Sequence, residues 1–341
     1  MNKVSRKMEA DHEEPYEIVC DDPQYLENAI FRCSLQDENC GSFGSKLVKF
    51  CRLFFWVFCL PPRPQAITNK LAFAPPKAAY KFVKKGEADG HQPILDILFS
   101  LQVKYATMLV INGQEVHQTQ GDLRSDVQLP NYAKQKVQGF KILGSESKNA
   151  VAVAHITQSE DAPFTILYSH GNSCDFGHTL HFLSVLCTVT RCNLITYDYS
   201  GFGESTGSPS EQGMYADHYA TYQFLLSKFN LTPDRVILFG HSIGTVAAVE
   251  LATRVDVAGV ILEAPLLSGW KVMHESNCVK KHVNPFPSDI RAPKVKAPVL
   301  VMHGTDDDII YMEDGAELCK RFRTAVEPLF IRGAGHNNMC W

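Results

Sequence analysis

The chain has 341 residues, 45% hydrophobic and 21% charged, so it can bury one large core or a domain with an appendage. Its net charge of −4 gives no reason to expect a nucleic-acid partner. The 11 cysteines are odd in number and irregularly spaced, and the first 25 residues are polar, which argues against a secreted disulfide framework and favours reduced thiols in the cytosol.

Residues 1–45 are predicted to form an acidic, largely disordered tail. Within them, residues 1–40 carry ten acidic and four basic side chains. Few apolar residues and no sustained periodicity leave this stretch without the means to bury a core.

Residues 46–86 are predicted to form a basic, cysteine-containing membrane anchor. Residues 46–85 carry nine basic side chains and no acidic one. The apolar run at 53–60 is far shorter than the ~20 residues that cross a bilayer. Aromatic residues beside lysines and arginines fit a segment that lies in the membrane interface, with Cys51 and Cys59 as candidates for S-acylation. A buried core helix is the alternative interpretation.

Residues 87–137 read as a variable linker region, with a possible strand at 105–111, and residues 138–341 as the catalytic domain. Apolar runs then alternate with amphipathic stretches, which predicts a mostly parallel, doubly wound α/β sheet covered by helices on both faces. Strands are expected at 139–143, 150–157, 164–169, 193–198, 235–239, 258–262, 298–302 and 327–331, and helices at 176–189, 211–229, 243–254 and 313–323.

The stretch "VILFGHSIGT" places a G-x-S-x-G sequence between an expected strand and an expected helix. A sharp strand-to-helix turn crowds its neighbours, so glycines flank the serine and expose its hydroxyl. Ser242 is therefore the candidate nucleophile, and a helix-capping serine is the structural alternative.

The turn "LYSHGNSCD" follows another expected strand. The backbone N–H groups of Asn172 and Ile243 are the candidate oxyanion-hole donors, because an acyl-transfer intermediate needs two such groups. His170 reads as a packed structural histidine.

Two further turns supply a carboxylate and an imidazole. In "VMHGTDDDII", spacing alone does not choose among three consecutive aspartates, and Asp198 is a rival that reads better as part of a structural turn. His336, in "IRGAGHNN", is the candidate general base. The chain order serine, aspartate, histidine is typical of α/β-hydrolases, whose chemistry needs no metal or organic cofactor.

The motifs "PPRPQAITNKLAFAPP", "SHGN", "YDYSGFGESTGSPSE", "GHSIGT", "HGTDDDII" and "GAGHN" together resemble the alpha/beta-hydrolase-domain-containing 17 proteins. The resemblance covers about residues 47–83 and 138–337. It implies a membrane-bound serine hydrolase that removes palmitate from S-acylated proteins, on the cytoplasmic side of plasma and endosomal membranes. It also implies that Asp307 is the triad carboxylate and that Cys51 and Cys59 are palmitoylated.

The chain departs from this family at four places. It has an acidic N-terminal extension, only two cysteines in the anchor, and His241 where relatives commonly have glutamine. Only "NMCW" follows the GAGHN turn, so the family's C-terminal helix is expected to be missing and apolar sheet surface to be uncovered.

The sequence thus predicts an acyl-protein thioesterase. About 35 residues separate the strands expected at 258–262 and 298–302, enough for a small cap but not for a deep lid, which favours a bulky protein substrate. The alternatives are a lipid or carboxyl esterase, and a catalytically weak, membrane-tethered binding protein.

Overall fold

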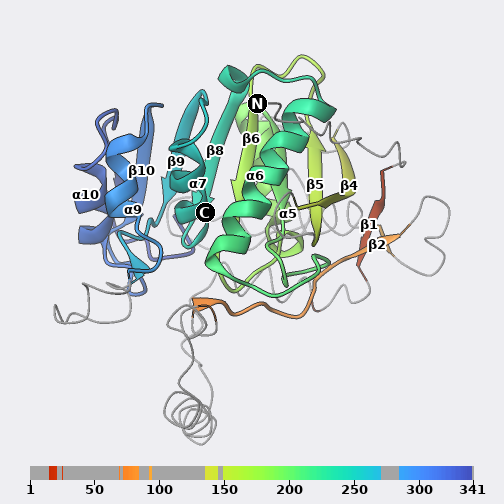
Figure 1. Ribbon diagram of the computed structural model, residues 1–341, viewed down its shortest axis with the longest axis horizontal. Coiled ribbons are helices and arrows are strands. Elements are labelled where there is room, and N and C mark those ends of the chain that lie inside the picture. Colours follow the sequence, from red (N-terminus) through yellow and green to blue (C-terminus); the bar gives the residue numbers. More distant parts are fainter. Residues whose placement is uncertain are drawn as a thin grey trace, which may run out of the picture.

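The computed structural model describes residues 15–20, 25, 69, 72–83, 92–93, 135–144, 149–269 and 284–339. Their centre is an eight-stranded sheet in the order β11-β10-β9-β8-β6-β7-β5-β4 (Figure 1). The β4–β5 and β5–β7 pairs are antiparallel and the other five pairs are parallel. The predicted α/β-hydrolase architecture is therefore confirmed.

The strands begin and end within a few residues of their predicted positions. They are β4 (Lys136–Leu143), β5 (Ala150–Thr157), β6 (Thr165–Ser169), β7 (Asn193–Tyr197), β8 (Val236–His241), β9 (Gly259–Glu263), β10 (Val299–Gly304) and β11 (Leu329–Ile331). Because β4 starts at Lys136, the domain begins before the predicted boundary at residue 138.

Helices cover both faces of this sheet. Successive side chains of a strand point to opposite faces, so each strand contributes to two separate hydrophobic cores. Val151 and Val153 of β5 face the core under α6 (Glu211–Lys228), α7 (Gly244–Ala252) and α10 (Met312–Cys319). Ala152 and Ala154 face the core under α5 (Phe176–Thr190). Short helical turns complete the domain, at η2 (Pro233–Arg235), α9 (Ser288–Arg291) and η3 (Ala292–Lys294).

The two long helices begin at side-chain caps. Asp175 accepts a hydrogen bond from the N–H of His178 and forms a capping box at α5. Ser210 accepts one from the N–H of Gly213 at α6. Each cap satisfies a backbone donor that the helix leaves unpaired and is worth about 1 kcal/mol.

The predicted disorder of residues 1–45 is wrong for one short stretch. β1 (Glu17–Cys20), β2 (Lys81–Val83) and β3 (Gln92–Pro93) form a three-stranded sheet in the order β2-β1-β3. An antiparallel bridge between Tyr16 and Gly139 joins this sheet to β4. A strand as short as "EIVC" lies below the length at which alternation can be recognised in a sequence.

The face of the sheet that α5 covers is less completely buried at the end formed by β9, β10 and β11. Ile261 of β9 and Leu300 and Met302 of β10 are partly exposed there. In β11, Leu329, the register partner of Met302, is 48% exposed on the same face. The sequence predicts uncovered apolar sheet surface but does not indicate at which end of the sheet it lies.

Several sequence expectations lie outside the described residues. They concern the candidate lipidation sites Cys51 and Cys59, the possible strand at 105–111 and part of the predicted cap, residues 270–283. Within the part of the chain that the structure describes, no helix has both the length and the apolar character that a membrane span requires.

Candidate active site

Ser242 sits at the turn between β8 and α7 with a backbone φ of 53°, in the left-handed region that non-glycine residues rarely adopt. The flanking glycines explain how the turn fits. A Cβ on Gly240 would meet the backbone of Gly244, and one on Gly244 would meet the carbonyl of Ser169. The G-x-S-x-G spacing thus permits a turn that holds the serine hydroxyl above the sheet.

Ser242, His336 and Asp307 form a continuous hydrogen-bonded chain. Nε2 of His336 lies 2.9 Å from Oγ of Ser242, and Nδ1 of His336 lies 2.8 Å from Oδ2 of Asp307. The carboxylate can only accept, so it fixes the proton on Nδ1 and leaves Nε2 free to accept the serine proton. His336 itself is 5% exposed.

The structure distinguishes the three consecutive aspartates. Asp307 is buried, and its Oδ1 accepts hydrogen bonds from the N–H groups of Ile309 and Ile310. Asp306 and Asp308 are exposed. Burial alone would raise the pKa of Asp307, but hydrogen bonds from His303 and His336 outweigh it and hold that pKa well below its usual range. Asp307 therefore remains a carboxylate beside the imidazole.

His303 is a residue of this site that the sequence analysis missed. Its Nε2 donates to the carbonyl of Ile310 at 2.8 Å and lies 3.2 Å from Oδ2 of Asp307. It is fully buried behind the carboxylate, four residues before it in the chain. The only signal in the sequence was its place at the end of an expected strand, which a packed histidine shares.

His241 lies on the other side of the imidazole. Its Nε2 is 3.2 Å from the carbonyl oxygen of His336, and the two rings are 5.3 Å apart. Burial, more than the opposing charge of Glu263, lowers the pKa of His241, so the ring is neutral and Nε2–H donates to the carbonyl. His241 thus holds the backbone of His336 rather than its reactive nitrogen.

Asn172 and Ile243 border the same cavity as Ser242. Ile243 is the N-cap residue of α7, where N–H groups have no partner within the helix and the helix dipole favours negative charge. The two candidate oxyanion donors are thus brought together with the candidate nucleophile, one from each neighbouring turn.

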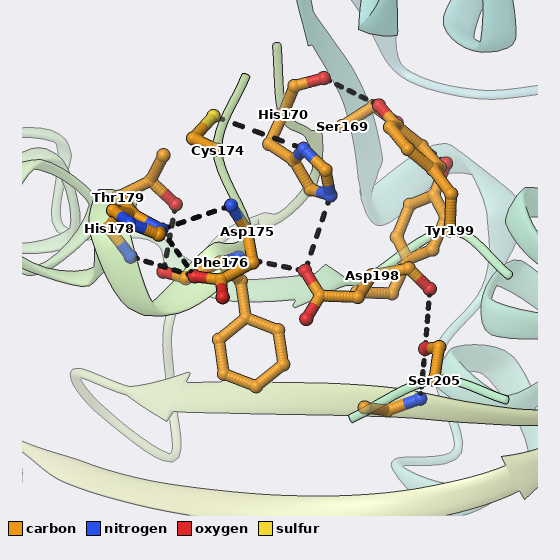
Figure 2. Close-up of polar contacts among 12 residues, drawn as sticks. Ser169, His170, Cys174, Asp175, Phe176, His178, Thr179, Asp198, Tyr199 and Ser205 are labelled. Atoms are coloured by element: carbon orange, nitrogen blue, oxygen red, sulfur yellow. Dashed lines mark hydrogen bonds and ion pairs between the residues drawn. The ribbon is translucent and has the colours of Figure 1, made fainter. Parts of the chain in front are cut away.

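His170 and Asp198 pair with each other, away from the serine. Nε2 of His170 lies 3.2 Å from Oδ1 of Asp198, and both side chains are fully buried (Figure 2). Nδ1 of His170 lies 2.7 Å from the carbonyl of Gly171. These contacts agree with the structural roles predicted for His170 and Asp198.

A cavity of about 530 Å³ opens beside Ser242, within the range of small-molecule binding sites. Part of its wall is apolar and comes from four segments of the chain: Ala72, Leu266, Phe286, Ile309 and Ile310. Among the described residues, no group of three or more histidine, cysteine or acidic side chains is placed to hold a metal ion.

A sheet of this order, with a serine at the turn into a helix and a histidine after the last strand, defines an α/β hydrolase. Residues 166–293 match the family model described as alpha/beta hydrolase family. The chain is 36% identical over 283 residues to alpha/beta hydrolase domain-containing protein aho-3 of Caenorhabditis elegans, covering 83% of this chain and 76% of that protein. It is 34% identical over 309 residues to human alpha/beta hydrolase domain-containing protein 17C, covering 87% and 91% of the two chains.

The chain therefore belongs to the alpha/beta hydrolase domain-containing protein 17 family. Among solved structures, a puromycin-hydrolyzing peptidase of Mycobacterium tuberculosis superposes with a TM-score of 0.50 at 15% identity. That match covers 61% of this chain and 37% of the peptidase and reflects the shared fold alone.

Proposed function

We propose that this hydrolase is an acyl-protein thioesterase that removes fatty acyl groups from cysteine side chains of membrane-associated proteins. One observation carries the proposal: the hydrogen-bonded chain from Ser242 through His336 to Asp307 opens into a cavity with an apolar wall. The chain supplies an activated nucleophile, and the wall suits a fatty acyl group.

In this mechanism Oγ of Ser242 attacks the thioester carbonyl while Nε2 of His336 takes the serine proton. Asp307 stabilises the imidazolium that forms. The N–H groups of Asn172 and Ile243 bind the oxyanion of the tetrahedral intermediate. Collapse of the intermediate breaks the C–S bond, and the imidazolium gives its proton to the departing thiolate. A water molecule, deprotonated by His336, then releases the fatty acid and restores the serine.

The acyl chain would lie along the apolar wall of the cavity. Ile309 and Ile310 lie two and three residues after Asp307, whereas Leu266 and Phe286 come from either side of the cap region. Ile309 is also 55% exposed, so the apolar surface continues from the cavity to the outside of the molecule. An open, partly apolar cavity suits an acyl group that is presented on the surface of a protein.

The same proposal includes attachment to the cytoplasmic side of membranes, where S-acylated proteins are found. Its support is the sequence of residues 46–86: a basic segment with an aromatic run and the acylation candidates Cys51 and Cys59. Acylation of both cysteines would supply the two signals that stable anchoring needs.

The test has two steps. Wild-type protein should react with a fluorophosphonate probe, and Ser242→Ala should not react while remaining folded by circular dichroism. The purified wild type should then release palmitate from a palmitoylated cysteine peptide faster than from a monoglyceride. Preference for the monoglyceride would indicate a lipid esterase, and absence of labelling in the folded wild type would indicate a binding protein.

A further inference from the structure

A strap formed by residues 72–80 crosses from the cavity to the back of the oxyanion-hole loop, residues 170–175. It runs along one edge of the domain as an extended segment and leads into β2 (Figure 1, orange). The mechanism proposed above gives no role to the strap beyond the place of Ala72 in the cavity wall. Three sets of contacts nevertheless tie it to the loop that carries Asn172.

The first contact lies at the cavity itself. Ala72 forms part of the cavity wall, and the N–H of Ala74 donates to Oδ1 of Asn172 at 3.0 Å. Phe73 anchors this end of the strap, because its ring is buried edge-on against Phe202 and Phe286. The strap therefore holds the side chain of Asn172, the residue whose backbone N–H is a candidate oxyanion donor.

The second contact lies at the far end of the loop. The N–H of Ala79 donates to Oδ2 of Asp175 at 2.8 Å, and Oδ1 of the same carboxylate caps α5. Asp175 is fully buried. The loop is thus held by strap N–H groups at two places, at Asn172 within the loop and at Asp175, its last residue.

The third contact runs through Tyr80 to Asp198, whose own contacts with His170 and Phe176 behind the loop are drawn in Figure 2. The Tyr80 hydroxyl donates to Oδ2 of Asp198 at 2.6 Å. Oδ1 of Asp198 accepts the N–H of Phe176 at 2.8 Å and lies 3.2 Å from His170. Burial, with the charge of Asp198, raises the pKa of Tyr80, which keeps its hydroxyl a donor. One buried carboxylate therefore links the strap to the residues on both sides of the loop.

These contacts point to a catalytic consequence. We propose that the strap positions the oxyanion hole, with Tyr80 as a positioning residue that acts through Asp198 and with Ala74 acting through Asn172. The proposal rests on the serine-hydrolase chemistry proposed above and extends it. Because oxyanion donors must meet charge that develops only in the transition state, a displaced loop lowers the rate of the chemical step more than it weakens substrate binding.

The test uses Tyr80→Phe in the full-length protein, because it removes one hydroxyl and keeps the ring that stacks on Phe176 at 3.9 Å. The matched control is Tyr222→Phe. Tyr222 is also a buried tyrosine with a hydrogen-bonded hydroxyl, which donates to the backbone carbonyl of Asp256 at 3.2 Å. It belongs to α6 and the opposite core. Thermal unfolding of both variants reports their structural effect.

The catalytic readouts are the turnover of p-nitrophenyl butyrate per titrated active site and the rate of fluorophosphonate labelling. Tyr80→Phe is expected to lower kcat about 10-fold, less than the ~10²–10³ caused by loss of a whole donor, with KM changed less than twofold. Tyr222→Phe is expected to leave kcat unchanged. If both variants lose thermal stability alike and both keep the wild-type kcat, the strap only supports the fold and the inference is overturned.

A second variant keeps the test decisive should Tyr80→Phe fold poorly. Asn172→Ala removes the acceptor for the Ala74 N–H and retains the backbone N–H of residue 172, so it should show the same loss in kcat with little change in KM. An unchanged kcat in this variant would also overturn the inference. The rate of fluorophosphonate labelling does not depend on thioesterase activity. A protein that fails to hydrolyse acyl-peptides would therefore contradict the proposed substrate, while the labelling rates of the variants could still be compared with that of the wild type.

Discussion

Asp306, Asp307 and Asp308 are residues of the same type, and they differ only in their surroundings. Of the three, Asp307 alone is buried and lies against His336, with His303 behind it. Packing, and not residue type, therefore determines which of the three aspartates belongs to the candidate site. Replacing each aspartate by asparagine keeps the size of the side chain and removes its charge, so it tests the three positions directly.

Asp307→Asn is expected to lower kcat by roughly 10³–10⁴-fold, because an amide cannot hold the imidazole in the required tautomer or stabilise its charged form. Asp306→Asn and Asp308→Asn, at exposed positions, should change kcat less than twofold. Turnover of a soluble ester by the three purified variants measures this. Equal losses in all three would remove Asp307 from the proposed triad.

His241 allows a second prediction at this scale. Its Nε2–H donates to the carbonyl of His336, and the glutamine side chain also carries an amide donor. His241→Gln should keep near wild-type activity, whereas His241→Leu should lose about fivefold in kcat/KM, equivalent to ~1 kcal/mol for one hydrogen bond. Steady-state kinetics of the two variants test this prediction. Comparable values of kcat/KM would mean that the hydrogen bond from His241 to the carbonyl of His336 has no positioning role.

At the scale of elements, the acylation candidates Cys51 and Cys59 are separable from the described site in the proposed function. That site involves no residue before Ala72, which lies within the basic segment 46–86 but after both cysteines. Binding to membranes and hydrolysis of a soluble ester should accordingly respond to different substitutions.

Cys51→Ser with Cys59→Ser should move the protein from membranes to the soluble fraction, because the proposed anchor would lose both acyl chains. Each single substitution should give a partial shift, since one chain alone binds only marginally. Ester hydrolysis by the purified double variant should match the wild type. Cell fractionation checks the prediction, and a double variant that stays on membranes would favour the alternative of an ordinary hydrophobic helix.

The elements also show what the sequence could and could not reveal. Strands such as β8 and β10 are predictable because continuous apolar runs between turns carry a strong signal. The G-x-S-x-G turn is predictable because its glycines are sterically required. The strap is different: two of its three contacts use the backbone N–H groups of Ala74 and Ala79, which every residue except proline possesses. Those two contacts therefore leave no recognisable pattern.

For the whole molecule, buried histidines predict how stability depends on pH. Burial, with a smaller effect of Lys136, lowers the pKa of His155 to about 4, and burial lowers that of His218 to about 3. An unfolded histidine titrates near ~6.5. Between about pH 6.5 and pH 4 the unfolded chain binds protons that the folded chain excludes, so the free energy of unfolding falls as the pH falls.

At pH 5.0 each of these histidines should have cost about 2 kcal/mol of stability relative to pH 7.5. In His218→Phe the difference in unfolding free energy between the two pH values should be smaller by that amount. The ring can still stack on Tyr197, at 5.4 Å in the wild type, so the fold should persist. Urea unfolding at both pH values measures the difference, and an unaltered pH dependence would contradict the burial argument.

The order of the strands has a consequence for how the protein is made. Ser242 and His336 are 94 residues apart in the chain, and β9, β10 and β11 lie between them in sequence. During synthesis the segment with Ser242 leaves the ribosome first and can fold ahead of later segments. Its hydroxyl then has no base until β11 has paired with β10 and the following loop has closed over the turn. A nascent chain would carry an inert serine, and hydrolytic competence would arrive only with the last strand of the sheet.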